Sequence, residues 1–262
     1  MNYKNNLLNI DERGVAFVTL NRPHVHNAMS AELIQEMQHI CATIESDNRV
    51  RVVVLSGAGE TFCAGGDLKW MESNITKTRA QRVKETGELA NMLAALNGLS
   101  KPLIGRIQGP AYGGGVGMIS VCDISIGVDT AAFGLTEVKL GLTPATISPY
   151  VVKRIGATHA RRNFFNSRIF KADEAKNINL LTDVVSANEL DKAIEKEVNM
   201  ILKCAPGAIA STKKLIDYVD THTAADNRIY TAANLADAWE TEEGKEGIDA
   251  FLNKRKASWT ES

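Results

Sequence analysis

Two glycine-rich segments hold the residues of this chain with the clearest chemical use. The first reads GPAYGGGVGM over residues 109–118, and the second reads FCAGGDLKW over residues 62–70. Each follows a run of apolar residues that is typical of a strand. Glycines at such turns let backbone N–H groups approach a ligand closely, and the start of a following helix favours a negatively charged oxygen. Two donors facing one carbonyl oxygen would form an oxyanion hole.

The glycines do not fit the common nucleotide-binding motifs. A dinucleotide fingerprint needs glycines at positions i, i+2 and i+5, and a phosphate-binding loop needs Gly-Lys followed by Ser or Thr. Neither pattern occurs in the sequence. For each segment taken alone, a tight strand-to-helix turn without any chemistry remains the alternative.

Cysteine and histidine offer weaker candidates for chemistry. Cys63 lies inside the second glycine segment, but no neighbouring histidine supports it as a nucleophile. His24 and His26 form a His-x-His pair without a nearby acidic partner, so we predict no metal site. The cysteines are widely spaced, as expected of reduced thiols, and we predict that all of them lie in the core: Cys41, Cys63, Cys122 and Cys204.

The elements that must position the glycines follow an alternating pattern. Apolar runs predict strands at residues 14–21, 49–57, 102–109 and 123–128, and a helix capped by Ser30 lies between the first two. This alternation indicates an α/β fold with parallel strands. From about residue 158 the pattern becomes mostly helical, with one short strand in LTDVVS.

Composition narrows the class of protein. The chain has 262 residues and a formal net charge of −1, which argues against nucleic acid or an anionic membrane as a partner. No apolar run reaches the length of a membrane span, and the N-terminal residues have no leader-peptide pattern. We therefore expect a cytoplasmic protein.

Five segments together resemble the crotonase superfamily, the enoyl-CoA hydratases and isomerases. They read LNRPHVHNAMS, GAGETFCAGGDLKWM, GPAYGGGVGM followed by CDISIG, AAFGLTEVKLGL and EGIDAFLNKRK, in that order from about residue 14 to 256. The resemblance implies a spiral of ββα units over residues 1–200 and a helical trimerisation region over residues 201–262. It also implies a homotrimer or hexamer, an acyl-CoA thioester as substrate, and no cofactor beyond the coenzyme A of that substrate.

The resemblance assigns roles to individual positions. The N–H groups of Gly66 and Gly114 would form the oxyanion hole, and Glu137 would be the catalytic acid or base. The coenzyme A would lie along Val25, Ala64, Asp67 and Leu68, mostly through backbone atoms. Phe251 and Lys254 match a C-terminal pair that reaches coenzyme A, often from a neighbouring subunit, although Lys254 also fits a solvated helix face.

The acids of this chain depart from the family pattern, since hydratases commonly have a second glutamate where this chain has Gly117. Glu137 alone suits an isomerase, and it suits a hydratase if one carboxylate both activates water and returns the proton. The segment GLTPATISPYVVKRIG (141–156) and Gly117 resemble the methylglutaconyl-CoA and isohexenylglutaconyl-CoA hydratase branch. We therefore favour a hydratase of a branched, carboxylated enoyl-CoA, with an isomerase or a non-catalytic acyl-CoA-binding paralogue as alternatives.

Two expectations concern the carboxylated substrate. Gly117 is expected to make room for the acyl chain and to tolerate a glutamate. Arg154, Arg161 and Arg162 are expected on exposed helix faces, where one of them would be a candidate partner for the substrate carboxylate. Some relatives in the superfamily bind AU-rich RNA, which the near-zero net charge disfavours here.

Overall fold

A computed structural model describes residues 3–260 of the chain. The larger of its two sheets has six strands in the order β1-β2-β3-β4-β6-β9. Strand β1 pairs antiparallel with β2, and every other neighbouring pair is parallel. The strands are β1 (Asn6–Ile10), β2 (Val15–Leu20), β3 (Val52–Gly57), β4 (Leu103–Ile107), β6 (Ile124–Val128) and β9 (Asp183–Val185). The predicted parallel α/β arrangement is confirmed, although the sequence analysis missed β1.

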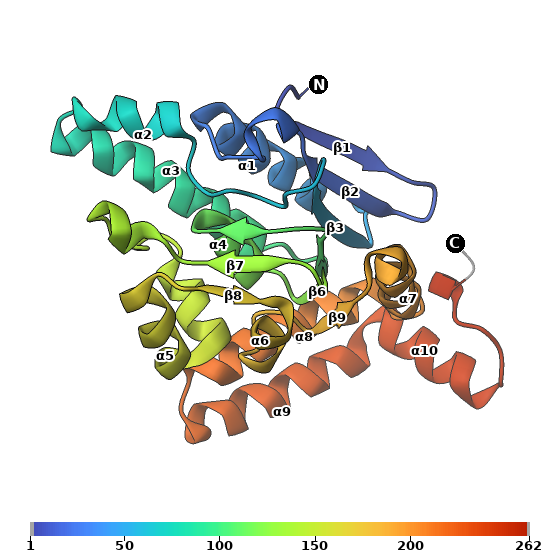
Figure 1. The fold of residues 1–262 in the computed structure, drawn as a ribbon. Helices are drawn as coiled ribbons and strands as arrows, with labels where there is room; N and C mark the ends of the chain where they lie inside the picture. Colours follow the sequence, from blue (N-terminus) through green and yellow to red (C-terminus); the bar gives the residue numbers. More distant parts are fainter. Residues whose placement is uncertain (1–2, 261–262) are drawn as a thin grey trace.

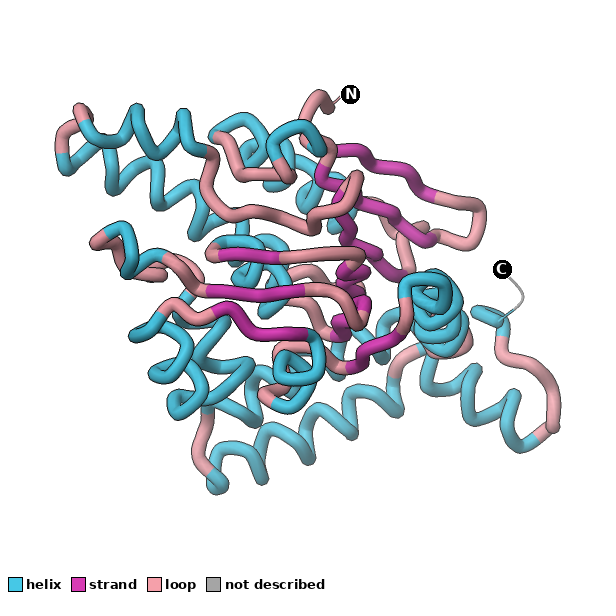
Figure 2. Tube along the Cα trace, in the orientation of Figure 1, coloured by secondary structure: helices cyan, strands magenta, loops and turns pink. Residues whose placement is uncertain are grey.

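A second sheet of three short strands crosses beside the first (Figure 2). Its order is β5-β7-β8, with β5 and β7 parallel and β7 and β8 antiparallel. The strands are β5 (Ala111–Tyr112), β7 (Ala132–Gly134) and β8 (Ile169–Lys171). This sheet positions the first glycine-rich segment and Glu137, because β5 leads into Gly113 and β7 leads toward Glu137.

Ten α-helices and four short 3-10 helices connect and cover the strands over the described residues (Figure 1). The α-helices are α1 (Ala31–Ser46), α2 (Leu68–Ile75), α3 (Arg79–Asn97), α4 (Gly114–Ser120), α5 (Ser148–Asn166), α6 (Ala172–Asn177), α7 (Leu190–Ile201), α8 (Pro206–Thr221), α9 (Ala224–Glu240) and α10 (Glu242–Leu252). The 3-10 helices are η1 (Pro23–Val25), η2 (Glu137–Leu140), η3 (Ala187–Glu189) and η4 (Ser258–Thr260). As predicted, Ser30 caps α1 by accepting a hydrogen bond from the Leu33 N–H, at 3.3 Å.

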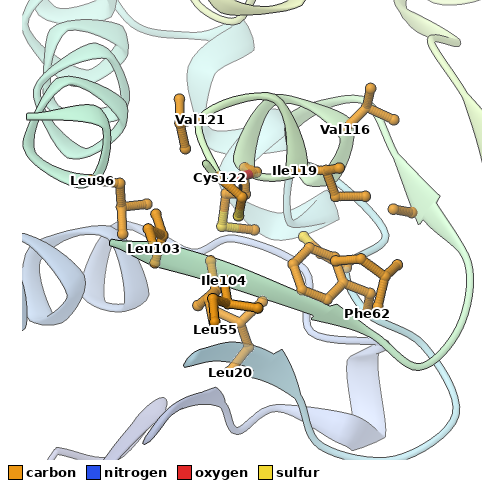
Figure 3. Close-up of a cluster of buried hydrophobic side chains, with 14 of the residues drawn as sticks. Leu20, Leu55, Phe62, Leu96, Leu103, Ile104, Val116, Ile119, Val121 and Cys122 are labelled. Atoms are coloured by element: carbon orange, nitrogen blue, oxygen red, sulfur yellow. Dashed lines mark hydrogen bonds between the residues drawn. The ribbon is translucent and has the colours of Figure 1, made fainter. Parts of the chain in front are cut away.

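The core lies between the parallel strands and the short helix α4 (Figure 3). Val52 to Leu55 of β3 are all buried, as expected for a central parallel strand covered on both faces. Every residue of α4 is buried too, and Val116 and Ile119 of that helix belong to the same hydrophobic cluster as Phe62. The glycines at the start of α4 therefore belong to a helix that is packed on all sides.

The C-terminal helices differ from the rest of the chain in how little they bury. Helices α8 and α9 have no buried residue, and α10 has only Ala250. Large apolar side chains remain exposed on them, among them Ile216, Ile229, Leu235 and Trp239. Figure 1 shows these helices, in orange and red, along one side of the chain. An amphipathic helix normally covers its apolar stripe, so these faces lack a partner within the described part of the chain.

Candidate active site

The segment from β5 into α4 presents backbone N–H groups without an acceptor among the described residues, and Gly114 has the first of them. Gly113 precedes α4 with φ at 49°, a conformation that L residues rarely adopt, and its own N–H donates to the Gly134 carbonyl at 2.9 Å. Gly114 is the first residue of α4, where a helix offers its N–H no acceptor. Across residues 3–260 this N–H has no hydrogen-bond partner.

The segment after β3 presents a second N–H. The Gly65 carbonyl accepts from the Met29 N–H at 2.8 Å, and the Asp67 N–H donates to the Met29 carbonyl at 3.0 Å. Because a trans peptide is planar, a Gly65 carbonyl that faces Met29 turns the Gly66 N–H away from Met29. This N–H likewise has no acceptor among the described residues.

The two segments run against each other with only backbone between them. A Cβ atom on Gly65 would lie 3.0 Å from the Tyr112 carbonyl oxygen and 3.8 Å from the Gly114 nitrogen. Gly65 also has φ at 93°, so a side chain is excluded by conformation and by space. The structure thus brings the segments of Gly66 and Gly114 together, as an oxyanion hole requires.

Glu137 begins η2 directly beside Gly113. A Cβ atom on Gly113 would lie 2.9 Å from Glu137 Oε1, so the carboxylate packs on the turn that leads into α4. Its other oxygen, Oε2, is buried and has no hydrogen-bond partner within residues 3–260. Burial raises the pKa of Glu137 above its ordinary value, because the carboxylate loses hydration that no cation replaces. A half-buried carboxylate with a free oxygen next to two free N–H groups can exchange protons with a bound ligand.

Ile147 fills the space beside Gly117, the position at which hydratases of the family commonly have a second glutamate. A Cβ atom on Gly117 would lie 2.4 Å from Ile147 Cγ2, and Ile147 is buried in the core cluster. The expectations that Gly117 makes room for an acyl chain and tolerates a glutamate are therefore wrong in the space beside Gly117, which a neighbouring side chain already fills. The sequence held no signal for this contact, since Gly117 is in α4 and Ile147 lies 30 residues further on, just before α5.

Four residues expected along coenzyme A lie near this site. Ala64 donates its N–H to the His26 carbonyl at 2.9 Å, which places it beside the η1 loop that contains Val25. Asp67 and Leu68 follow Gly66, and the Leu68 side chain is 80% exposed. The Asp67 carboxylate is committed inside the chain: it caps α2 through the Lys69 and Trp70 N–H groups and forms an ion pair with Arg22. Its backbone is also bonded within the chain, since the N–H donates to the Met29 carbonyl and the carbonyl accepts from the Met71 N–H.

Phe251 and Lys254 do not join the other site residues within one chain. Phe251 lies on α10 and is 83% exposed, and Lys254 follows α10 with φ at 54°. Figure 1 shows α10 on the opposite side of the structure from α2.

The three arginines considered as partners for a substrate carboxylate differ in their exposure. Arg154 is half-buried rather than exposed, and its guanidinium donates to the Cys122 and Asn179 carbonyls, so it is not free for a substrate carboxylate. Arg161 and Arg162 are exposed, as predicted.

The cysteines and histidines show no reactive arrangement. Burial raises the pKa of the Cys63 thiol to about 12, which keeps it protonated near neutral pH. Cys204 is exposed, so the expectation that all four cysteines lie in the core is wrong for this one. His26 contacts the Thr61 hydroxyl through Nδ1 at 3.0 Å.

Comparisons with known proteins agree with this geometry. The family model for enoyl-CoA hydratase/isomerase matches residues 11–262. The chain belongs to the enoyl-CoA hydratase/isomerase family. A short-chain-enoyl-CoA hydratase of Clostridium acetobutylicum is 35% identical over 261 residues, covering 96% of each chain.

Solved structures extend the family likeness to the fold. An enoyl-CoA hydratase from Shewanella pealeana superposes with a TM-score of 0.95 at 32% identity, covering 98% of this chain and 96% of that one. AtuE of Pseudomonas aeruginosa gives a TM-score of 0.93 at 35% identity, covering 98% and 100%. The fold is therefore the α/β crotonase fold with C-terminal helices, and the chain is an enzyme of the enoyl-CoA hydratase class, a hydro-lyase. Among residues 3–260, none of the helices combines the length and the apolar composition that a transmembrane span requires.

Proposed function

We propose that this enzyme adds water across the α,β double bond of an acyl-CoA thioester, with Glu137 as the acid and base and Gly66 and Gly114 as oxyanion donors. The observation that carries the proposal is the free Oε2 of Glu137 beside two segments whose N–H groups have no acceptor. The thioester oxygen would accept hydrogen bonds from both N–H groups, and these bonds strengthen as negative charge develops on it.

One carboxylate is sufficient for the complete reaction. Glu137 takes a proton from water as the water oxygen bonds to the β carbon, and the electrons of the double bond move through the α carbon to the thioester oxygen. The resulting enolate is held by the two N–H groups. Protonated Glu137 then returns its proton to the α carbon, so that one water is consumed and the enzyme is restored.

For the acyl group we propose a branched, carboxylated enoyl-CoA such as methylglutaconyl-CoA. Support comes from Gly117 and from the 141–156 segment, which depart from the common hydratase pattern in the way described above. Arg154 is not the partner of the substrate carboxylate in this proposal, because its guanidinium is already bound to carbonyl groups.

A single carboxylate also favours an isomerase as a second candidate. An isomerase removes a proton at one carbon and returns it at another, which needs no second acid. A panel of crotonyl-CoA, methylglutaconyl-CoA, isohexenylglutaconyl-CoA and a β,γ-enoyl-CoA separates these functions. Hydration lowers the absorbance of the conjugated thioester, whereas isomerisation into conjugation raises it. A rise with the β,γ substrate and no fall with the others would reject the hydratase, and binding without any turnover would indicate a non-catalytic paralogue.

We also propose that the chain assembles as a homotrimer or a dimer of trimers through residues 201–262. The uncovered apolar faces of α8 to α10 support this assembly, as does the distance of Phe251 and Lys254 from the rest of their own chain's site. In the proposal these two residues reach coenzyme A bound to a neighbouring copy, where Lys254 would attract its phosphates. Analytical ultracentrifugation tests this directly, and a monomer at micromolar concentration would refute it.

A further inference from the structure

Arg22 and Asp67 form the most buried ion pair of the described residues. Their closest charged atoms are 2.8 Å apart, and their side chains are 15% and 9% exposed. In every other ion pair within residues 3–260, at least one side chain is 29% exposed or more. A buried pair contributes little net stability compared with apolar side chains of similar size, so its presence calls for another explanation.

Each end of this pair is fixed by further hydrogen bonds. Asp67 Oδ1 accepts from the backbone N–H groups of Lys69 and Trp70, at 2.9 and 3.3 Å, while Oδ2 faces Arg22. Burial favours a higher pKa for Asp67, but the contacts from Arg22, Trp70 and Lys69 outweigh it and lower the pKa. Asp67 is therefore ionised at neutral pH.

Arg22 is held by its own loop in the same way. Its backbone N–H donates to Asn27 Oδ1 at 2.9 Å, and its guanidinium nitrogen Nη1 donates to the Ala28 carbonyl as well as contacting Asp67. The Asn27 side chain is fully buried and donates in turn to the Ala58 and Thr61 carbonyls. One guanidinium nitrogen thus ties the 22–29 loop to the segment that follows β3.

The two groups that Arg22 contacts, the Ala28 carbonyl and the Asp67 carboxylate, belong to the two segments that hold the Gly66 N–H. Ala28 immediately precedes Met29, whose N–H and carbonyl bind Gly65 and Asp67. Asp67 immediately follows Gly66. Movement of either loop would rotate the Gly65–Gly66 peptide, and with it the direction of the Gly66 N–H.

We propose that Arg22 is a positioning residue, which acts through Asp67 and Ala28 to fix the Gly66 N–H in the direction that the thioester oxygen requires. This inference rests on the proposed function. A misplacement of about 1 Å in a catalytic group can lower turnover roughly 100-fold. Loss of the Arg22 contacts should therefore lower kcat more than it lowers the affinity for the substrate.

The test separates positioning from stabilisation. Arg22→Met alone would leave the Asp67 charge without its partner in a buried site, which destabilises the fold. The double variant Arg22→Met/Asp67→Asn removes both charges and keeps an oxygen that can cap α2. We expect this double variant to fold with a melting temperature near that of the wild type, while kcat falls about 10–100-fold and KM changes less than about threefold.

Two further variants complete the series. Arg22→Lys keeps a charged nitrogen, and since one nitrogen of Arg22 makes both contacts, its kcat should lie between those of the wild type and the double variant. Arg13→Met serves as a matched control, because Arg13 lies in the turn between β1 and β2, away from the site, and pairs with Asp11 of that turn and Glu195 of α7. Its kcat should equal that of the wild type.

A spectroscopic measurement tests the hydrogen bond from the Gly66 N–H without requiring turnover. A cinnamoyl-CoA thioester absorbs at longer wavelength when its carbonyl is polarised, and this shift should shrink in the double variant but persist in Arg13→Met. A folded double variant with wild-type kcat and an unchanged shift would overturn the positioning role. If the wild type itself neither shifts this thioester nor turns over any enoyl-CoA, the proposed function fails, and the positioning role falls with it.

Discussion

Ile147 fills the volume that a side chain at position 117 would occupy: a Cβ atom on Gly117 would lie 2.9 Å from the Cβ of Ile147. Ile147 is 2% exposed and precedes α5, whereas Gly117 lies in the middle of α4. The two residues therefore form a packed contact between α4 and the residue that precedes α5. The space beside Gly117 is therefore filled by an apolar side chain.

This contact predicts how a restored acid would behave. Gly117→Glu should destabilise the fold by about 1–3 kcal/mol, the usual cost of overpacking. In an Ile147→Ala background the same substitution should cost less, because the methyl groups that it meets are absent. Denaturant unfolding of the four proteins in this cycle measures the coupling. Equal costs in both backgrounds would show that the two side chains do not compete for space.

Loss of the surviving acid should abolish most of the activity. Glu137→Gln keeps the size of the side chain but removes its basicity, so kcat should fall about 100- to 10,000-fold while acyl-CoA affinity changes little. Stopped-flow turnover and equilibrium binding measure the two effects. An unaltered kcat in the folded variant would remove Glu137 from the mechanism.

The raised pKa of Glu137 predicts two pH effects of opposite sense. The carboxylate must be ionised to accept a proton from water, so kcat/KM should fall as the pH drops through a value above the ordinary glutamate pKa. For stability, a carboxyl whose pKa is higher in the folded state binds more protons when folded, so it disfavours the folded state increasingly as pH rises through that window.

Glu137→Gln removes this disadvantage, so the variant should melt about 1–3 °C higher than the wild type at pH 8. The difference should shrink as the pH falls toward the ordinary pKa of glutamate. Calorimetry at several pH values checks the sign, and a melting-temperature difference that grows as the pH falls would contradict the burial of an ionised carboxylate.

The Gly114 donor can be removed with a close control. Gly114 is the first residue of α4, a position where proline is well tolerated, so Gly114→Pro deletes the N–H without breaking a helical hydrogen bond. A Cβ atom there meets the flexible end of Met29, at 1.9 Å from its methyl group. Gly114→Ala introduces the same contact but keeps the N–H.

The comparison between these variants isolates the hydrogen bond. Removing one oxyanion donor typically costs about 2.7–4 kcal/mol of activation free energy, which corresponds to a 100- to 1,000-fold lower kcat for Gly114→Pro than for Gly114→Ala. Both variants must first be shown to fold. Equal rates would mean that Gly114 donates no hydrogen bond in the transition state.

The sequence was sufficient for the elements with strong patterns. The parallel strands β2, β3, β4 and β6 follow long apolar runs, and Ser30 caps α1 as predicted. The sequence did not reveal β1 or the small sheet, because β5, β7 and β8 have only two or three residues each and owe their conformation to their neighbours. The strand propensity of two or three residues says little about whether they form a strand.

The site shows the same division. The roles proposed for Gly66, Gly114 and Glu137 come from the resemblance of the motifs that contain them to the family. Arg22 and Ile147 were not identified, because their effects depend on contacts with Asp67 and Gly117 that only the fold creates. Neither residue carries a distinctive pattern in its own stretch of sequence.

The parallel sheet also determines when this site can form as the chain folds. Parallel neighbours cannot be joined by a tight turn, so each pair from β2 to β9 is closed by a long crossover. Met29, Gly66, Gly114 and Glu137 each lie on a different one of these connections. Such distant pairings form slowly, whereas helices form early. During refolding, the far-UV helical signal should therefore return first, and polarisation of a bound thioester should return only with the last kinetic phase.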